Sequence, residues 1–301
     1  MEKAKHLIFS SFILKVAALL FMTLDDVGLL VRTMYYYKFE AVEASNVLRG
    51  FGRLALPLFV FMIVEGVIHT KNIKKYFLRL GIMALFISIV LAIVTYVDFG
   101  FDTSAISGAG NIFLDLLLLA VTIYLLKQEK IYLKFLAVIP LAISIISFAV
   151  KGYEVANFAS INWYPPWLYL QYDWFSLLLG ILFYFSYKIG DFYISIAKDE
   201  NGINEEYWEI EGHKRFLVNT IQVFMLVIVS VLYYAFKYIW PKGVFWDVET
   251  QLFAIGSGAF ILLYNGKRGY NAKWFQYGSY LYYPLHLGII ILIFIIINGG
   301  L

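Results

Sequence analysis

The chain has 301 residues, of which 61% are hydrophobic and 15% are charged, and its formal net charge is +3. Soluble globular chains have about 45–50% apolar and about 25% charged residues, so this composition predicts an integral membrane protein. The small net charge makes nucleic acid a poor candidate partner. The absence of cysteine excludes disulfides, thiolate nucleophiles and thiolate-held metals, and no metal is expected.

Nine segments are apolar and long enough to be considered as membrane spans, for which about 20 residues are needed. They lie at about 7–31, 54–70, 75–97, 111–127, 131–150, 164–188, 216–238, 248–265 and 274–298. The second, fourth and eighth are short, so their ends must snorkel or lie in a cavity lined by protein. We therefore expect an all-α fold, a polytopic bundle of about nine or ten transmembrane helices in a single domain over residues 1–301.

The distribution of lysine and arginine predicts the orientation of this bundle. Sixteen of these residues fall on the side of the N-terminus, among them those of 71–75, 127–134 and 188–215, and seven fall on the opposite side. Because short cytoplasmic loops are enriched in basic residues, the N-terminus is expected in the cytoplasm of a multi-pass plasma-membrane protein. The polar stretch at about 189–215 is then a cytoplasmic loop.

Ionisable side chains within these spans are candidate functional residues, because a charge in lipid is costly. Glu65 and His69 are four residues apart in the second span and share one face of a helix. Asn111 and Asp115 repeat this spacing at the outer start of the fourth span, where Asn111 also fits a helix cap. Asp173 lies near the outer end of a later span. Packing alone seldom explains a glutamate or aspartate side chain that lies within lipid.

Two adjacent carboxylates, Asp25 and Asp26, lie near the outer end of the first span, and Arg53 precedes the second. Neighbouring residues point about 100° apart on a helix, so at most one of the two carboxylates faces a given cavity. Alternatively, both mark a helix end in water.

The last span contains Tyr283, Pro284 and His286. His286 is about 18 Å from the cytoplasmic end at 1.5 Å per residue, which places it near the middle of the membrane. Pro284 removes a backbone hydrogen bond and favours a kink that can line a cavity. Imidazole titrates near neutral pH, so His286 suits the role of general base.

Cationic and amide side chains are expected at the cytoplasmic mouth, where they could bind the phosphates of a donor: Lys71, Lys74, Lys75, Asn265, Lys267 and Arg268. The reactive end of such a donor would reach the histidine at mid-depth. An acceptor would arrive there from the lipid or the outer side.

The motifs at Gly52 to Tyr76, Asn111-Ile112-Phe113, Tyr264 to Gly269 and Tyr283 to His286 resemble the TraX family of membrane proteins. The resemblance implies a relative of the transmembrane acyltransferases that takes an acetyl group from acetyl-CoA. The acceptor it implies is a peptide, a pilin-like N-terminus or a cell-envelope glycan. The candidate catalytic residues are His286, Asp25, Asp26, Glu65 and His69, and the candidate substrate-binding residues are Arg53, Asn111, Asp115, Asp173 and Tyr283.

One departure from the family pattern concerns the first span, where this chain reads Asp25-Asp26-Val27-Gly28 in place of Asp-His-Ile-Gly. If the missing histidine is the family's base, either His286 takes over its role or catalysis has been lost. The alternative is therefore a non-enzymatic member, acting as a transporter with proton sites at Glu65, Asp115 or Asp25, or as a receptor or immunity factor.

Overall fold

The computed structural model describes residues 7–35, 38–97, 110–157, 161–201, 212–239 and 248–297. Over these residues the regular elements are helices, and an isolated parallel bridge joins Phe9 to Tyr264. The predicted all-α class is thus confirmed. The chain divides into two compact units: unit 1 comprises Met1–Met62, Leu182–Tyr234 and Val248–Gly300, and unit 2 comprises Ile63–Ile181, Ala235–Asp247 and Leu301.

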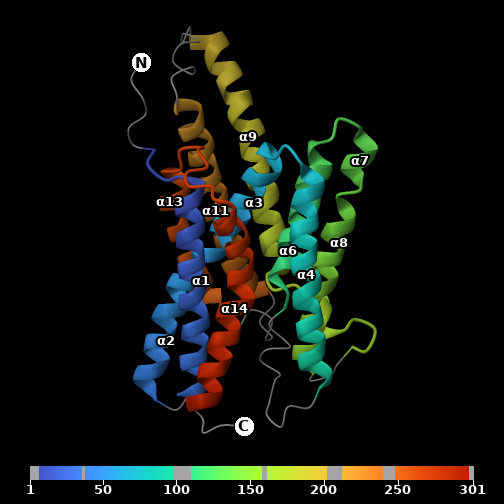
Figure 1. Ribbon diagram of the computed structural model, residues 1–301. Coiled ribbons are helices and arrows are strands. Elements are labelled where there is room, and N and C mark those ends of the chain that lie inside the picture. The colour runs from blue at the N-terminus through green and yellow to red at the C-terminus, as the bar shows by residue number, and fades with distance from the viewer. Residues whose placement is uncertain are drawn as a thin grey trace. The chain divides into compact units, whose positions relative to one another are not determined.

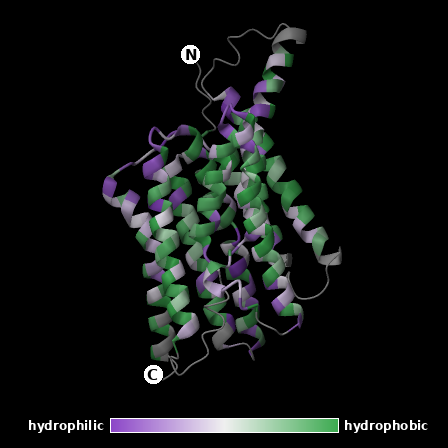
Figure 2. Ribbon diagram, turned by 90° about the vertical axis from the view of Figure 1, so that its right-hand side faces the viewer, coloured by the Kyte–Doolittle hydropathy of each residue, from purple (hydrophilic) through white to green (hydrophobic). Residues whose placement is uncertain are grey.

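Five helical stretches of the described residues are long and apolar enough to cross a membrane: Phe39–His69, Ile73–Tyr96, Ile131–Asn157, Pro166–Ala197 and His213–Phe236. Figure 2 shows hydrophobic residues along much of the helices and hydrophilic ones gathered towards helix ends and connecting segments. This distribution is that of a membrane protein. The count of nine spans and the orientation of the N-terminus stay predictions.

Unit 1 contains two neighbouring helices, α1 and α2, that pack closely, with α14 also beside α1 (Figure 1). A Cβ atom on Gly28 of α1 would lie 2.7 Å from Cγ of Arg49 on α2, so only glycine allows this approach. The hydroxyl of Ser45 donates a 2.7 Å hydrogen bond to the Gly28 carbonyl. The helices with residues in this unit are α1 (Ser11–Met34), α2 (Phe39–Gly52), α3 (Ala55–His69), α9 (Asp173–Asn201), α11 (His213–Ile239), α12 (Val248–Gln251), η2 (Leu252–Ser257), α13 (Gly258–Leu262) and α14 (Lys273–Ile297).

Unit 2 is built on α4 (Ile73–Tyr96), α6 (Ile112–Lys127) and α8 (Val138–Asn157), together with the adjoining parts of α3, α9 and α11. The short helices α7 (Ile131–Phe135) and η1 (Pro166–Leu168) complete it. Helix α6 packs against both α4 and α8 (Figure 1). Helix α9 approaches α6 so closely that a Cβ atom on Gly180 would collide with the side chain of Leu119.

The helix boundaries differ from the predicted spans in three places. Helix α2 lies where no span was expected, because its mixture of charged and apolar residues falls below the hydropathy of a span. Helix α9 continues to Asn201, so the first half of the 189–215 stretch, expected to be a cytoplasmic loop with room for an interfacial helix, continues the preceding helix. The predicted spans at 131–150 and 248–265 are each divided into shorter helices.

Candidate functional site

A buried pair of ionisable groups in unit 1 joins α1 to α14. Nε2 of His286 lies 2.7 Å from Oδ2 of Asp26, and the His286 residue is 6% exposed. The two residues are 260 positions apart in the chain. The structure therefore brings together the histidine and the carboxylate that the sequence had singled out separately.

The partners of the His286 ring determine where its protons lie. Nδ1 lies 2.9 Å from the carbonyl oxygen of Tyr282, and because a carbonyl only accepts, Nδ1 must carry a proton. Nε2 faces the carboxyl group of Asp26, so a further proton must lie between these two groups. Either the ring is an imidazolium or Asp26 is protonated. The pair therefore shares one proton in both descriptions, and the ring has no nitrogen lone pair left for a substrate.

Aromatic rings and a hydroxyl group fix the position of this pair. The Tyr282 ring stacks on the imidazole with centroids 5.0 Å apart, and the Tyr283 ring meets it edge-on at 5.6 Å. The hydroxyl of Tyr282 is 2.6 Å from that of Thr23, which lies one turn before Asp26 on α1. Tyr283, expected to bind substrate, thus contacts the candidate base directly.

The neighbouring carboxylate, Asp25, faces α2 instead of α14. Its Oδ1 lies 3.6 Å from Nε of Arg49, and its Oδ2 lies 3.8 Å from Nη1 of Arg53. All three side chains are at most 17% exposed. As expected for adjacent residues, Asp25 and Asp26 contact different partners. The buried Asp25 carboxyl group thus lies between two arginines and links α1 to α2.

The loop that follows α13 lies against the N-terminal end of α1. The backbone N–H groups of Ser11 and Phe12 donate to the carbonyls of Lys267 and Arg268 at 2.9 and 3.1 Å. Both basic side chains are exposed, and Gly266 and Gly269 have φ angles of +74° and +68°, the left-handed region that glycine adopts readily. The Lys267 N–H itself donates to Asn265 Oδ1, so any anion must be bound here chiefly by the side chains.

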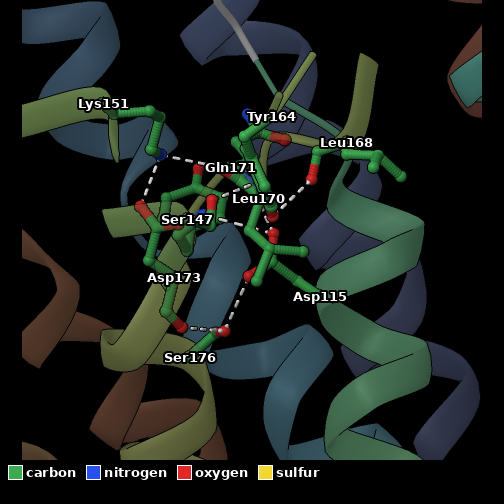
Figure 3. A network of polar contacts seen from close by, with 10 residues as sticks. Asp115, Ser147, Lys151, Tyr164, Leu168, Leu170, Gln171, Asp173 and Ser176 are labelled. Atoms are coloured by element: carbon green, nitrogen blue, oxygen red, sulfur yellow. Dashed lines mark hydrogen bonds and ion pairs between the residues drawn. The ribbon is translucent and has the colours of Figure 1, made fainter. Parts of the chain in front are cut away.

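Unit 2 holds a separate polar network at the start of α9 (Figure 3). Asp115 accepts hydrogen bonds from the N–H groups of Gln171 and Tyr172 at 2.7 and 3.2 Å and from the Ser176 hydroxyl at 3.0 Å. Asn111 caps α6 through the Leu114 N–H, as predicted, and its side-chain amide donates to the Ala84 carbonyl at 2.7 Å. These bonds anchor the segment before α9 to α4 and α6.

A lysine completes the network in unit 2. Lys151 of α8 forms an ion pair with Asp173 and donates a 2.6 Å hydrogen bond to the Leu170 carbonyl. Nearby, burial raises the pKa of Tyr164, so its hydroxyl stays protonated and donates to the Leu168 carbonyl. Of the side chains expected to bind substrate here, Asn111 and Asp115 form hydrogen bonds to the protein's own backbone and Asp173 pairs with Lys151.

The other predicted residues of unit 2 divide into buried and exposed ones. Glu65 and His69 do share a helix face: Nδ1 of His69 lies 3.0 Å from the Glu65 carbonyl and 3.7 Å from Glu65 Oε2. The Glu65 side chain is 8% exposed and that of His69 is 59% exposed. The basic residues at the start of α4, namely Lys71, Lys74 and Lys75, are all exposed.

Sequence reasoning missed three contributors to these sites. No role in a site was assigned from the sequence to Arg49, Lys151 or Tyr282. Arg49 and Arg53 are four residues apart, a spacing that indicates a shared helix face. If this segment had been considered as a helix, the spacing would have placed both arginines on one face.

Comparison with known proteins agrees with the resemblance inferred from the motifs at Gly52 to Tyr76 and Asn111-Ile112-Phe113. The model of the family described as TraX protein matches residues 10–197, more than half of the chain. The chain belongs to the TraX family. A 77-residue stretch is 40% identical to a protein of Dichelobacter nodosus named "Probable fimbrial assembly protein FimC, serogroup H1". That stretch covers 26% of this chain and 29% of the relative, so the chain is matched to less than a third of the relative's length. No solved structure matches this TraX protein significantly.

Proposed function

We propose that this TraX protein is an acetyltransferase of the plasma membrane that moves an acetyl group from cytoplasmic acetyl-CoA to an acceptor on a peptide or envelope glycan. The observation that carries the proposal is the buried Asp26–His286 pair, which shares a proton and lies between two helices of an apolar bundle. The similarity to a protein named as a fimbrial assembly protein makes the N-terminal amine of a pilin-like peptide the first acceptor to test.

The pair supplies the proton chemistry of this transfer. The amine or hydroxyl of the acceptor attacks the thioester carbonyl carbon, forming a C–N or C–O bond as the C–S bond breaks. The acceptor loses one proton to the pair, and the electron pair leaves with sulfur as the thiolate of CoA, to which the pair returns a proton. Because both imidazole nitrogens are engaged, Oδ1 of Asp26 receives the proton and His286 orients and stabilises that carboxylate.

The donor's phosphates would be bound by Lys267 and Arg268, which are exposed in the loop beside the start of α1. Asp26 is 14 residues beyond Phe12 on this helix, or about 21 Å at 1.5 Å per residue. An extended pantetheine arm has about 13 bonds from phosphorus to sulfur and spans about 16 Å, to which the acetyl group adds about 2 Å. The length of the donor thus suits the separation between the basic loop and the pair.

The proposal is tested with purified protein, acetyl-CoA and a pilin-like peptide, with mass spectrometry to detect acetylated product. Asp26→Asn removes the base and should reduce turnover by about 10²–10⁴-fold while CoA still binds, and His286→Ala, which removes the group that orients this base, should also reduce turnover. Asp26→His restores the family's residue and tests whether a histidine serves better at this position.

Binding of the donor is tested separately by calorimetry. Replacing Lys267 and Arg268 together by alanine should weaken CoA binding at least about tenfold. Lys130→Ala removes an exposed charge of unit 2 and serves as the control. Failure of the unmodified protein to bind CoA would refute the proposal and favour a transporter, receptor or immunity factor.

A further inference from the structure

Helix α11 presents a buried polar face that neither the sequence nor the proposed reaction accounts for. Arg215, Asn219 and Gln222 are spaced four and three residues apart, so they lie along one side of the helix. Asn219 and Gln222 are fully buried, with no exposed surface at all. Amide side chains in such a position need partners for both their donors and their acceptors.

The amide nitrogens have partners, and these partners determine how the amides are oriented. Nδ2 of Asn219 donates to the carbonyls of Leu262 and Tyr264 at 3.2 and 2.9 Å, and Nε2 of Gln222 donates to the Phe183 carbonyl at 3.2 Å. A carbonyl only accepts, so neither amide can be turned over without loss of these bonds.

The two amide oxygens are left without a donor. Oδ1 of Asn219 and Oε1 of Gln222 are buried and have no hydrogen-bond partner within the part of the chain that the structure describes. A buried acceptor without a donor costs about 1–3 kcal/mol, and these two atoms lie three residues apart on one helix face. They favour a ligand that brings two hydrogen-bond donors.

Arg215 connects this face to the basic loop. Its guanidinium group lies 4.5 Å from the Tyr264 ring centroid, and its Nη1 donates a 2.6 Å hydrogen bond to the Tyr187 hydroxyl. A Cβ atom on Gly266 would lie 3.9 Å from Cδ of Arg215, so the arginine is next to the loop that carries Lys267 and Arg268. The loop that carries Lys267 and Arg268 thus lies next to Arg215. Asn219 and Gln222 follow Arg215 along α11.

We propose that this face of α11 binds the pantetheine arm of the acyl donor, with Asn219 Oδ1 and Gln222 Oε1 accepting hydrogen bonds from its two amide N–H groups. The proposal rests on the proposed use of acetyl-CoA. The two amide nitrogens of pantetheine are four bonds apart, or about 5 Å. Side chains at positions i and i+3 of a helix have Cβ atoms about 5–6 Å apart, which is comparable with this spacing. Arg215 then lies on the side of the pyrophosphate.

The experiment compares two ligands that share adenosine with its 3′-phosphate and first 5′-phosphate, the second of which lacks the outer phosphate of the pyrophosphate as well as the arm. CoA and adenosine 3′,5′-bisphosphate, which lacks pantetheine, are titrated by calorimetry into the detergent-solubilised protein and its variants. Gln222→Met keeps the side-chain volume and removes the acceptor, so CoA affinity should fall about three- to tenfold, as for one neutral hydrogen bond, while bisphosphate affinity stays unchanged.

The matched control is Thr220→Val on the exposed side of the same helix, which should bind both ligands normally. Unchanged CoA affinity in Gln222→Met, or equal loss for both ligands, would overturn the assignment while leaving donor binding intact. Absence of binding by either ligand to the unmodified protein would overturn the proposed function as well.

A second measurement leaves the protein unaltered, in case Gln222→Met does not fold. A CoA analogue with ester oxygens in place of both amide N–H groups should bind the unmodified protein at least about tenfold more weakly than CoA. Equal affinity for the two ligands would refute the proposal.

Discussion

Replacing Lys151 by methionine should raise the equilibrium constant for local opening of the polar network in unit 2. Lys151 forms an ion pair with Asp173 and donates to the Leu170 carbonyl, and its side chain is 22% exposed against 7% for Asp173. Methionine keeps most of the volume but leaves a buried carboxylate without its cation. The second oxygen of this carboxylate, Oδ1, already has no hydrogen-bond partner among the described residues.

The expected cost follows from the burial of the pair. Removing one partner of a buried ion pair costs about 3–5 kcal/mol, and the partial exposure of the lysine favours the lower value, about 3 kcal/mol. That cost corresponds to an increase of about 150-fold in the equilibrium constant for local opening. The double variant Lys151→Met with Asp173→Asn removes both charges and should recover most of the loss. Asparagine also tolerates the left-handed backbone of residue 173, whose φ is +49°.

A buried thiol measures this opening. Ser144 of α8 is 1% exposed, and its hydroxyl has no hydrogen-bond partner among the described residues, so Ser144→Cys introduces a reporter at little cost in this cysteine-free chain. The rate of thiol modification in detergent follows the open population when closing is fast. We expect a rise of about 100-fold in Lys151→Met and of less than about tenfold in the double variant.

Two results would refute this reasoning. An unchanged modification rate in Lys151→Met would mean that the ion pair contributes nothing to local stability. A double variant as reactive as the single one would mean that the lysine acts through its hydrogen bond to Leu170 and not through its charge. The parent with Ser144→Cys alone provides the reference in both cases.

Three further predictions concern packing and topology. Gly28→Ala should lower the thermal midpoint by forcing α1 away from Arg49, whereas Gly278→Ala on α14, where a Cβ would meet nothing within 4 Å, should raise stability by about 0.4–1 kcal/mol. A Gly28 variant as stable as the parent would contradict the close packing of α1 and α2. Asn111→Leu removes the cap of α6 and the bond to Ala84, and should cost about 1–3 kcal/mol in chemical denaturation. Lys198→Cys should be shielded from an impermeant thiol reagent in intact cells, and strong labelling would reverse the predicted orientation.

The sequence predicted the class of fold and many of the polar residues, because both depend on local composition and spacing. The i, i+4 relation of Glu65 and His69 and the cap at Asn111 follow from helix geometry alone. Their position within apolar segments of the sequence was also enough to single out Asp26 and His286.

The pairing between distant residues could not be predicted in the same way. Asp26 and His286 are 260 residues apart, and a single sequence contains no signal that joins them. The predicted span at 131–150 ended just before Lys151 because the charge of this residue lowers the local hydropathy. In the fold, the opposite charge of Asp173 on α9 compensates for it. Arg215 was used only as evidence for orientation, since its contacts with aromatic rings depend on tertiary structure.

The pairing of α1 with both its neighbour and the last helix has a consequence for biosynthesis. Asp25 meets its arginine partners as soon as α2 follows α1 out of the ribosome, because Arg49 and Arg53 are only 24 and 28 residues later. Asp26 must wait for a histidine 260 residues later, and at about 5–20 residues per second this delay is about 13–52 s. During that interval the nascent chain carries an uncompensated carboxyl group on its first helix. Assembly factors or the insertion machinery therefore have a specific intermediate to protect, and a chain truncated before α14 should be a preferred substrate of membrane quality control.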